Sequence, residues 1–296
     1  MSNMIATFFK KHFKRDYVGL LFVLPGLIFF CVFRFWPMIQ ALYVSLHEWN
    51  LLTAPKFIGL QNYAQLFSNT DLKESLIATF KYVIGSTIPL WVLALAVAIL
   101  FNREIVFRQG LLAAYFLPLI MSVAIVAVIF KLLYHPQGLL NVFLWYRFGF
   151  TLNWLTDKTI APLALIIMAL WKNLGYYTLL YLAGLEGIPI ELIEAAKIDG
   201  ASPWRTFVSI TLPLLRPTVV LVMVMSLISS FQAFTEQYIM TEGGPGNATR
   251  VLTLLIYQNA FQYLRMGWAS TMAILLFVII LLLTVIQMRL LKTDIY

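Results

Sequence analysis

Four long stretches of the chain carry no charged side chain, and they constrain the fold more than any other feature. They cover residues 82–102, 109–130, 217–235 and 266–288. A helix needs about 20 apolar residues to cross the hydrocarbon core of a bilayer. Over the whole chain 11% of residues are charged, against about 25% in an ordinary soluble domain. The sequence therefore predicts an all-α polytopic integral membrane protein with a single transmembrane domain, residues 1–296.

Two further apolar runs complete a prediction of six transmembrane helices. One begins near Tyr17 and is interrupted by Arg34 near its end, and the other contains Lys172 near its middle. The predicted spans are about 17–38, 77–101, 110–133, 160–184, 217–237 and 266–288.

The distribution of basic residues predicts the topology. An even number of spans places both termini on one side of the membrane. With the termini inside, the inner segments hold eleven Lys and Arg residues, and the longer outer segments hold six. Cytoplasmic flanks collect basic residues, so we expect cytoplasmic termini in a multi-pass protein. The same bias accounts for the net charge of +8 without a nucleic-acid partner.

The segment between the fourth and fifth spans, residues 187–215, is polar and contains residues that typically end one helix and start the next. Gly200 is typical of the residue just past the end of a helix. Ser202 followed by Pro203 is typical of a helix start, because the hydroxyl caps it and proline has a suitable φ. The sequence predicts a cytoplasmic helix-turn-helix.

The spacing of residues in this hairpin is distinctive. Its characteristic positions are Glu194-Ala195-Ala196, Asp199-Gly200-Ala201, Phe207, Ile210, Leu212-Pro213 and Pro217. This pattern resembles the cytoplasmic signature of permease subunits from binding-protein-dependent ATP-binding-cassette importers.

Other segments resemble the sugar-transporting branch of that family. They are Phe57-Ile58-Gly59-Leu60-Gln61-Asn62-Tyr63, the stretch from Leu185 to Pro189, and Thr241-Glu242-Gly243-Gly244-Pro245 followed by Thr249. Because the chain ends soon after its last span, it is most similar to the first permease type of maltose-like and glycerol-phosphate-like systems.

The resemblance implies a role for the hairpin. In this family it sits in a cleft of a cytoplasmic ATPase subunit and carries that subunit's motion to the spans. The residues expected to couple are Glu194, Ala195, Ala196, Asp199, Gly200, Ala201, Arg205, Leu212 and Pro213. The resemblance also implies a second, homologous permease subunit, two ATPase subunits and an extracytoplasmic solute-binding protein. Taken alone, the same residues could form a solvated loop whose acids only cap helices.

The chain contains no phosphate-binding G-x-x-x-x-G-K-[ST] motif. ATP and Mg²⁺ are therefore expected in the partner subunits, with no cofactor in this chain. We find no catalytic set and no metal-ligand spacing, and His12, His47 and His135 lie far apart in sequence. The sequence predicts a transporter subunit that is not itself an enzyme.

Two polar clusters within the spans are candidates for the substrate path. The first surrounds Lys172, which is too deep to reach the interface easily, so it must face protein or a water-filled cavity. The second lies in the outer half of the fifth span, with Ser229, Gln232 and Glu236 on one predicted helix face. Sugars need such mixtures of aromatic faces, amides and hydroxyls. The candidates are Lys172, Asn173, Tyr176, Tyr177, Ser229, Gln232 and Glu236.

Two alternatives remain open at this level. The polar clusters could serve helix–helix contacts, and Glu236 could pair with Lys172 across the bundle. An ion-coupled secondary transporter is the alternative function, although it would need paired midplane carboxylates or broken helices in two repeated halves. The predicted function is an inner-membrane importer permease for a sugar or sugar-like solute, with oligosaccharide, glycoside, polyol and glycerol phosphate all open.

Overall fold

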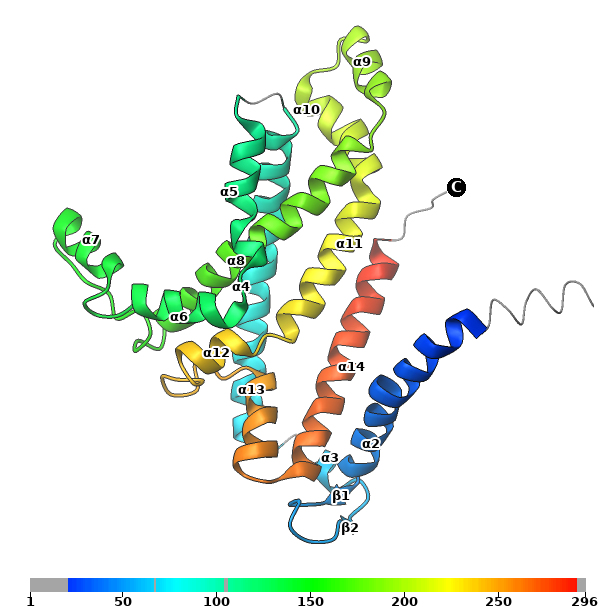
Figure 1. The fold of residues 1–296 in the computed structure, drawn as a ribbon, viewed down its shortest axis with the longest axis vertical. Helices are drawn as coiled ribbons and strands as arrows, with labels where there is room; N and C mark the ends of the chain where they lie inside the picture. The colour runs from blue at the N-terminus through cyan, green and yellow to red at the C-terminus, as the bar shows by residue number, and fades with distance from the viewer. Residues whose placement is uncertain (1–20, 67, 104–105, 292–296) are drawn as a thin grey trace, which may run out of the picture.

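The computed structural model describes residues 21–66, 68–103 and 106–291. Helices form most of this part of the chain, as predicted, and Figure 1 shows them as an elongated bundle with a hairpin at one end. Two short strands, β1 (His47–Glu48) and β2 (Lys56–Phe57), pair antiparallel at the opposite end.

The helices are joined by connections of very different lengths, the longest of which are 46–60, 149–159 and 241–251. In chain order they are η1 (Cys31–Phe35), α2 (Trp36–Ser45), α3 (Gln61–Leu66), α4 (Thr70–Phe101), α5 (Arg108–Ile120), α6 (Val123–Leu133), α7 (Leu139–Phe148), α8 (Ile160–Glu186), α9 (Ile190–Ile198), α10 (Pro203–Thr206), η2 (Phe207–Thr211), α11 (Leu212–Phe231), α12 (Thr235–Met240), α13 (Leu252–Tyr257), η3 (Gln258–Gln262) and α14 (Met266–Leu290).

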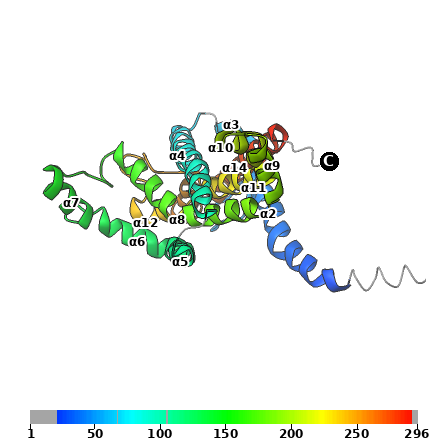
Figure 2. The ribbon, with the colours of Figure 1, turned by 90° about the horizontal axis from the view of Figure 1, so that it is seen from above.

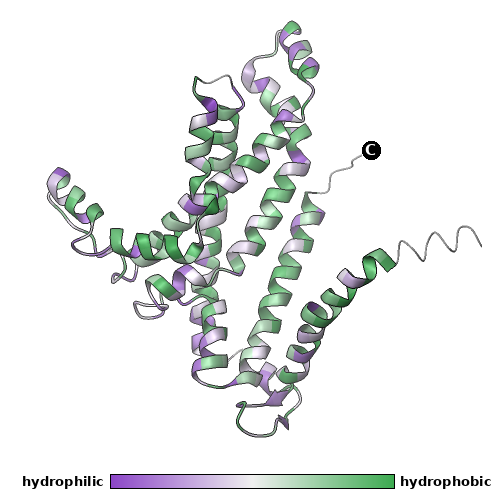
Figure 3. Ribbon diagram, viewed as in Figure 1, coloured by the Kyte–Doolittle hydropathy of each residue, from purple (hydrophilic) through white to green (hydrophobic). Residues whose placement is uncertain are grey.

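Five helical segments are long and apolar enough to cross a membrane, and the green of hydrophobic residues predominates along them in Figure 3. They are Leu21–Ser45, Thr70–Phe101, Ile160–Glu186, Pro203–Met240 and Met266–Leu290. A sixth crossing is available if the bent pair α5 and α6 counts as one span. This is consistent with the predicted count of six, while residues 17–20 of the first predicted span lie outside the described residues.

The third predicted span, 110–133, is not one continuous helix. It is divided into α5 and α6, whose axes differ by 98°. Pro118 lacks the N–H that would continue the helical ladder, and Met121 and Ser122 then adopt extended backbone with ψ of 141° and 138°. Ser122 starts the next helix, so the uncharged stretch conceals a break that composition alone could not reveal.

Helix boundaries also depart from the predicted ones elsewhere. The helix α4 begins at Thr70, because the Asn69 side chain accepts a hydrogen bond from the Leu72 N–H at 2.8 Å and caps it. The second arm of the hairpin runs without interruption into the fifth span, because α10, η2 and α11 are continuous from Pro203 to Phe231.

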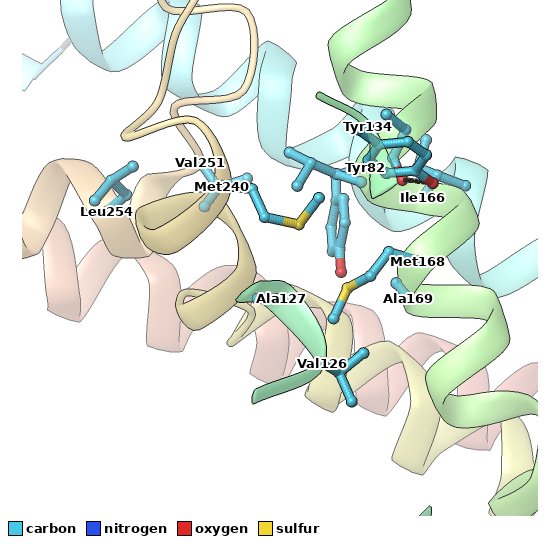
Figure 4. Packing of buried hydrophobic residues seen from close by; sticks show 12 residues of the cluster. Tyr82, Val126, Ala127, Tyr134, Ile166, Met168, Ala169, Met240, Val251 and Leu254 are labelled. Atoms are coloured by element: carbon cyan, nitrogen blue, oxygen red, sulfur yellow. Dashed lines mark hydrogen bonds between the residues drawn. The ribbon is translucent and has the colours of Figure 1, made fainter. Parts of the chain in front are cut away.

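The centre of the bundle is the long contact between α4 and α8, against which α11 packs. Seen from above, α2 and α7 extend from opposite sides of this centre (Figure 2). One hydrophobic cluster joins α4, α6, α8 and α12, and within it Tyr82 lies amid Met168, Ala169 and Met240 (Figure 4). This cluster borders the polar cavity described next.

Candidate functional site

A cavity of about 210 Å³ opens where α4, α8 and the junction of α11 with α12 meet. Its lining combines hydroxyl, amide, phenol, ammonium and carboxylate groups with a few apolar side chains. The polar lining residues are Tyr82, Ser86, Lys172, Asn173, Tyr177, Ser229, Ser230, Gln232, Thr235 and Glu236.

Six of the seven side chains predicted to line the substrate path border this cavity. They are Lys172, Asn173, Tyr177, Ser229, Gln232 and Glu236. Tyr176 is not among the lining residues, and its ring packs edge-on against that of Tyr177 with centroids 5.0 Å apart.

The geometry of the second cluster differs from the prediction. Ser229, Gln232 and Glu236 do not share one regular helix, because α11 ends at Phe231 and α12 begins at Thr235. Phe234 has φ −144° and ψ −50°, outside the helical region. This break changes the direction of the chain, so the prediction that the three residues share one helix face was wrong. All three nevertheless line the cavity.

Residues of α4 complete the cavity, and the sequence analysis missed them. The Tyr82 hydroxyl donates to Glu236 Oε1 at 2.6 Å, and Ser86 Oγ donates to Ser230 Oγ at 3.3 Å. A usable signal was present: Ser75, Thr79, Tyr82 and Ser86 recur at helical spacing, which is typical of a polar interhelical face.

Lys172 and Glu236 do not form an ion pair. Lys172 Nζ donates to the backbone carbonyl of Leu119 at 3.3 Å, whereas Glu236 accepts from Tyr82. The bend after α5 leaves the last carbonyls of that helix without helical partners. A cation at this negative end of the helix is electrostatically favourable, so Lys172 stabilises the bent span as well as lining the cavity.

Lys172→Met is expected to destabilise the folded protein by about 1–3 kcal/mol, because it leaves the partly buried carbonyl of Leu119 without its charged donor. Lys172 is 7% exposed. Thermal unfolding of the purified protein in detergent measures the effect.

Lys131→Met is the matched control for this substitution. Lys131 Nζ also donates to a backbone carbonyl, that of Ile239 at 2.8 Å, but the contact is exposed and water can replace the lysine. Equal losses of stability in the two variants would contradict the proposed role of Lys172.

The predicted coupling hairpin is α9 followed by α10, at the end of the bundle shown uppermost in Figure 1. Gly200 has φ +77°. Its N–H donates to the Lys197 carbonyl at 3.1 Å, and the Ala201 N–H donates to the Ala196 carbonyl at 2.9 Å. These two bonds form a Schellman motif, which ends α9 and satisfies its last carbonyls.

The second arm starts as the sequence pattern indicated. The Ser202 hydroxyl accepts from the Arg205 N–H at 3.3 Å, and Pro203 occupies the first turn. Among the predicted coupling residues, Ala196 is buried and Ala201 half-buried. The others are exposed: Glu194, Ala195, Asp199, Gly200, Arg205, Leu212 and Pro213.

The two most exposed large apolar side chains of the hairpin were not among the predicted coupling residues. Ile198 is 86% exposed and Trp204 is 73% exposed. Large apolar groups held in the open at a tight turn are typical of a protein-docking surface. Their exposure depends on the Schellman turn. The residue types predicted a turn at Gly200, but they did not indicate the directions in which the neighbouring side chains point.

An ion pair connects the base of the hairpin to two other helices. Arg108 Nη2 lies 2.6 Å from Glu186 Oε1, at the end of α8. Arg108 Nε also donates to the Phe101 carbonyl at 2.8 Å, at the end of α4. The hairpin therefore leaves α8 at a point where the ends of α4, α5 and α8 are connected.

The arrangement combines an internal polar cavity with an exposed helical hairpin. The cavity presents donors and acceptors beside tyrosine rings, which suits a solute rich in hydroxyl groups. The hairpin continues directly into the helix that lines the cavity, so a displacement at one is mechanically connected to the other.

Comparison with known proteins agrees with this architecture. Residues 75–295 match the family model described as "Binding-protein-dependent transport system inner membrane component". The chain is 34% identical over 288 residues to the probable ABC transporter permease protein YurN of Bacillus subtilis (strain 168), with 95% of this chain and 98% of that protein covered. It is 33% identical over 293 residues to the trehalose/maltose transport system permease protein MalF of Thermococcus litoralis, covering 98% of each.

A solved structure shares the fold. A chain of the bacterial alginate ABC transporter, crystallised with an alginate pentasaccharide-bound periplasmic protein, superposes with a TM-score of 0.84 at 24% identity, covering 96% of this chain and 98% of that one. The family match distinguishes an ABC importer subunit from the ion-coupled alternative. The chain belongs to the family of binding-protein-dependent transport system inner membrane components, in which it is a multi-pass permease subunit.

Proposed function

We propose that this permease conducts a saccharide through the cavity between α4, α8 and the α11–α12 junction. The observation that carries the proposal is the composition of the cavity, in which amide, hydroxyl and carboxylate groups converge beside tyrosine side chains. Saccharides bind through this combination, since their hydroxyls need hydrogen-bond partners and their ring faces pack on aromatics. Relatives named for trehalose/maltose and for starch degradation products support this class of cargo.

Free hydrogen-bonding capacity supports the same conclusion. Asn173 Nδ2 donates to the Ala169 carbonyl of its own helix at 2.9 Å, which leaves its Oδ1 as an acceptor. Gln232 follows the end of α11 with its side chain exposed. Both amides line the cavity and can bond the hydroxyls of a solute.

The hairpin supplies the coupling in this proposal. Glu194, Asp199 and Arg205 offer charged groups to an ATPase subunit, while Ile198 and Trp204 offer apolar area. ATP and Mg²⁺ bind to that partner, and two such subunits serve this chain and a second, homologous permease. The hairpin and both termini lie in the cytoplasm, and an extracytoplasmic binding protein delivers the cargo to the opposite end.

Asn173→Ala and Gln232→Ala are expected to reduce uptake or change its selectivity among saccharides. Removing one amide from a polar site costs about 0.5–1.5 kcal/mol per hydrogen bond, equivalent to roughly a 2–13-fold loss in apparent affinity. Uptake of labelled sugars into proteoliposomes containing the assembled importer and its binding protein measures the effect, alongside sugar-stimulated ATPase activity.

Gln137→Ala provides the control, because Gln137 is an exposed amide outside the cavity lining. Its uptake should equal that of the unmodified importer. Unchanged kinetics in both cavity variants would remove these residues from the path. Uptake that continued without ATP and collapsed with an ion gradient would refute the ATP-driven mechanism itself.

A further inference from the structure

The helix α7 projects from the bundle and exposes an unusual amount of apolar surface. Figure 1 and Figure 2 both show it extending away from the other helices. Six of its ten residues are large, apolar or aromatic, and exposed: Leu139, Val142, Phe143, Trp145, Tyr146 and Phe148. The most exposed, Tyr146, has 93% of its surface accessible.

This projecting helix, called the α7 arm below, is nevertheless held in a defined position. Asn141 is its one buried residue, and its side chain makes four hydrogen bonds shorter than 3.3 Å. Asn141 Nδ2 donates to the carbonyls of Pro136 and Leu152, at 3.2 and 2.9 Å. Asn141 Oδ1 accepts from the Leu152 N–H at 3.0 Å and from Trp154 Nε1 at 3.1 Å. The apolar face is therefore presented by a rigid base.

Two flanking elements indicate where the arm lies along the membrane normal. α6 precedes it and packs on α8 and α12. The loop that follows leads into α8, whose first turn is capped by Asp157, since its carboxylate accepts hydrogen bonds from Thr159 and from the Ile160 N–H. The hydrogen bonds from Thr159 and Ile160 lower the pKa of Asp157. α7 thus connects α6 to the first turn of α8, at the end of α8 that lies away from the hairpin.

The distribution of the exposed side chains around the helix identifies the kind of partner. At 100° per residue, positions 142, 143, 145, 146 and 148 cover more than half of the circumference, while Leu140 packs against the protein core. A groove on one protein partner covers a narrower stripe of a helix. Lipid surrounds a helix on every side that its own protein leaves open.

The residue types fit the membrane interface better than its core. Trp145 and Tyr146 are the types that collect at the headgroup level, where one part of the ring system is apolar and another is hydrated. Arg147 is the single charged residue of α7, and its positive charge complements lipid phosphates.

We propose that α7 lies in the outer interface of the bilayer and anchors the outer ends of the bent span and of α8 at that depth. The arm is a lipid-binding element, distinct from the cavity and from the coupling hairpin. A face this apolar would be unfavourable in water, since removing apolar surface from water is a dominant favourable contribution to folding and association.

Site-directed spin labelling tests the proposal in the complete importer, assembled with its partners in lipid nanodiscs. The chain has one cysteine, Cys31, so Cys31→Ser provides a background for Tyr146→Cys. The collision rates of the label with oxygen and with a water-soluble nickel chelate report lipid and water, respectively. We expect an oxygen-to-nickel ratio several-fold higher at position 146 than at a water-exposed control.

Leu52→Cys is the matched control, because Leu52 is also highly exposed, at 80%, in the β1–β2 loop at the end of the molecule opposite the hairpin. Phe143→Cys gives a second reading from α7 if the first variant folds poorly. A ratio at positions 143 and 146 equal to that at position 52 would place the arm in water. Slow collision with both reagents would place it against a protein partner, and either result overturns the proposal.

Discussion

Gly200→Val is expected to abolish ATP-driven transport while the permease remains inserted and assembled with its second subunit. Gly200 has φ +77°, and apart from its chain neighbours no atom of the described residues lies within 4 Å of the position that a Cβ would occupy. The cost is therefore conformational: an L-residue in the left-handed region is destabilised by about 1–2 kcal/mol, and a β-branched one is a stronger outlier. The turn between α9 and α10 must change, which moves Ile198 and Trp204 away from their positions on the proposed docking surface.

Two substitutions separate this explanation from a general effect of mutating the hairpin. Gly200→Asn is expected to retain most transport, since asparagine tolerates the left-handed region. Gly187→Val inserts the same side chain at the base of the hairpin, where the glycine has φ −78°, and should be far less damaging. Uptake and sugar-stimulated ATPase activity in proteoliposomes measure all three variants. Full coupling in Gly200→Val would refute the role of the hairpin turn.

The helical hairpin could be predicted in detail because its signals are local. A glycine past the last turn and a Ser-Pro pair at the next start each act through their own backbone and nearest neighbours. The same holds for the apolar spans, whose length is set by the bilayer. The departures occur where uncharged sequence hides irregular backbone, as at Met121–Ser122 and at Gln232–Phe234.

The cavity was predicted only in part, because it depends on which helices pack together. Polar residues of the fourth and fifth spans were identified by their depth in apolar sequence. Tyr82 and Ser86 were missed since hydroxyl groups in a span often serve helix packing alone. The absence of an ion pair between Lys172 and Glu236 has a similar origin. Each group has a nearer partner, the Leu119 carbonyl or the Tyr82 hydroxyl, created by tertiary structure.

The contact between α14 and the end of the first span depends on a close approach between the backbone at Gly267 and the backbone at His47. A Cβ at this position would lie 1.9 Å from the His47 carbonyl oxygen. The same oxygen accepts a hydrogen bond from Asn62 Nδ2 at 3.2 Å, and the neighbouring Trp49 carbonyl accepts from the Met266 N–H at 2.8 Å. The contact is with backbone on both sides, so rotation of a side chain cannot relieve it.

Gly267→Ala is therefore expected to destabilise the protein by about 1–3 kcal/mol or more, the range for overpacking a well-packed site. Because α2 packs chiefly on α14 within the described chain, the first span should also dissociate more readily. Thermal unfolding in detergent, together with protease sensitivity of the loop after α2, measures both effects. Gly26→Ala is the matched control: its Cβ would meet nothing within 4 Å, and alanine is favoured over glycine inside a helix by about 1 kcal/mol. The control should be at least as stable as the unmodified protein, and an unchanged unfolding temperature in Gly267→Ala would show that this contact can open without cost.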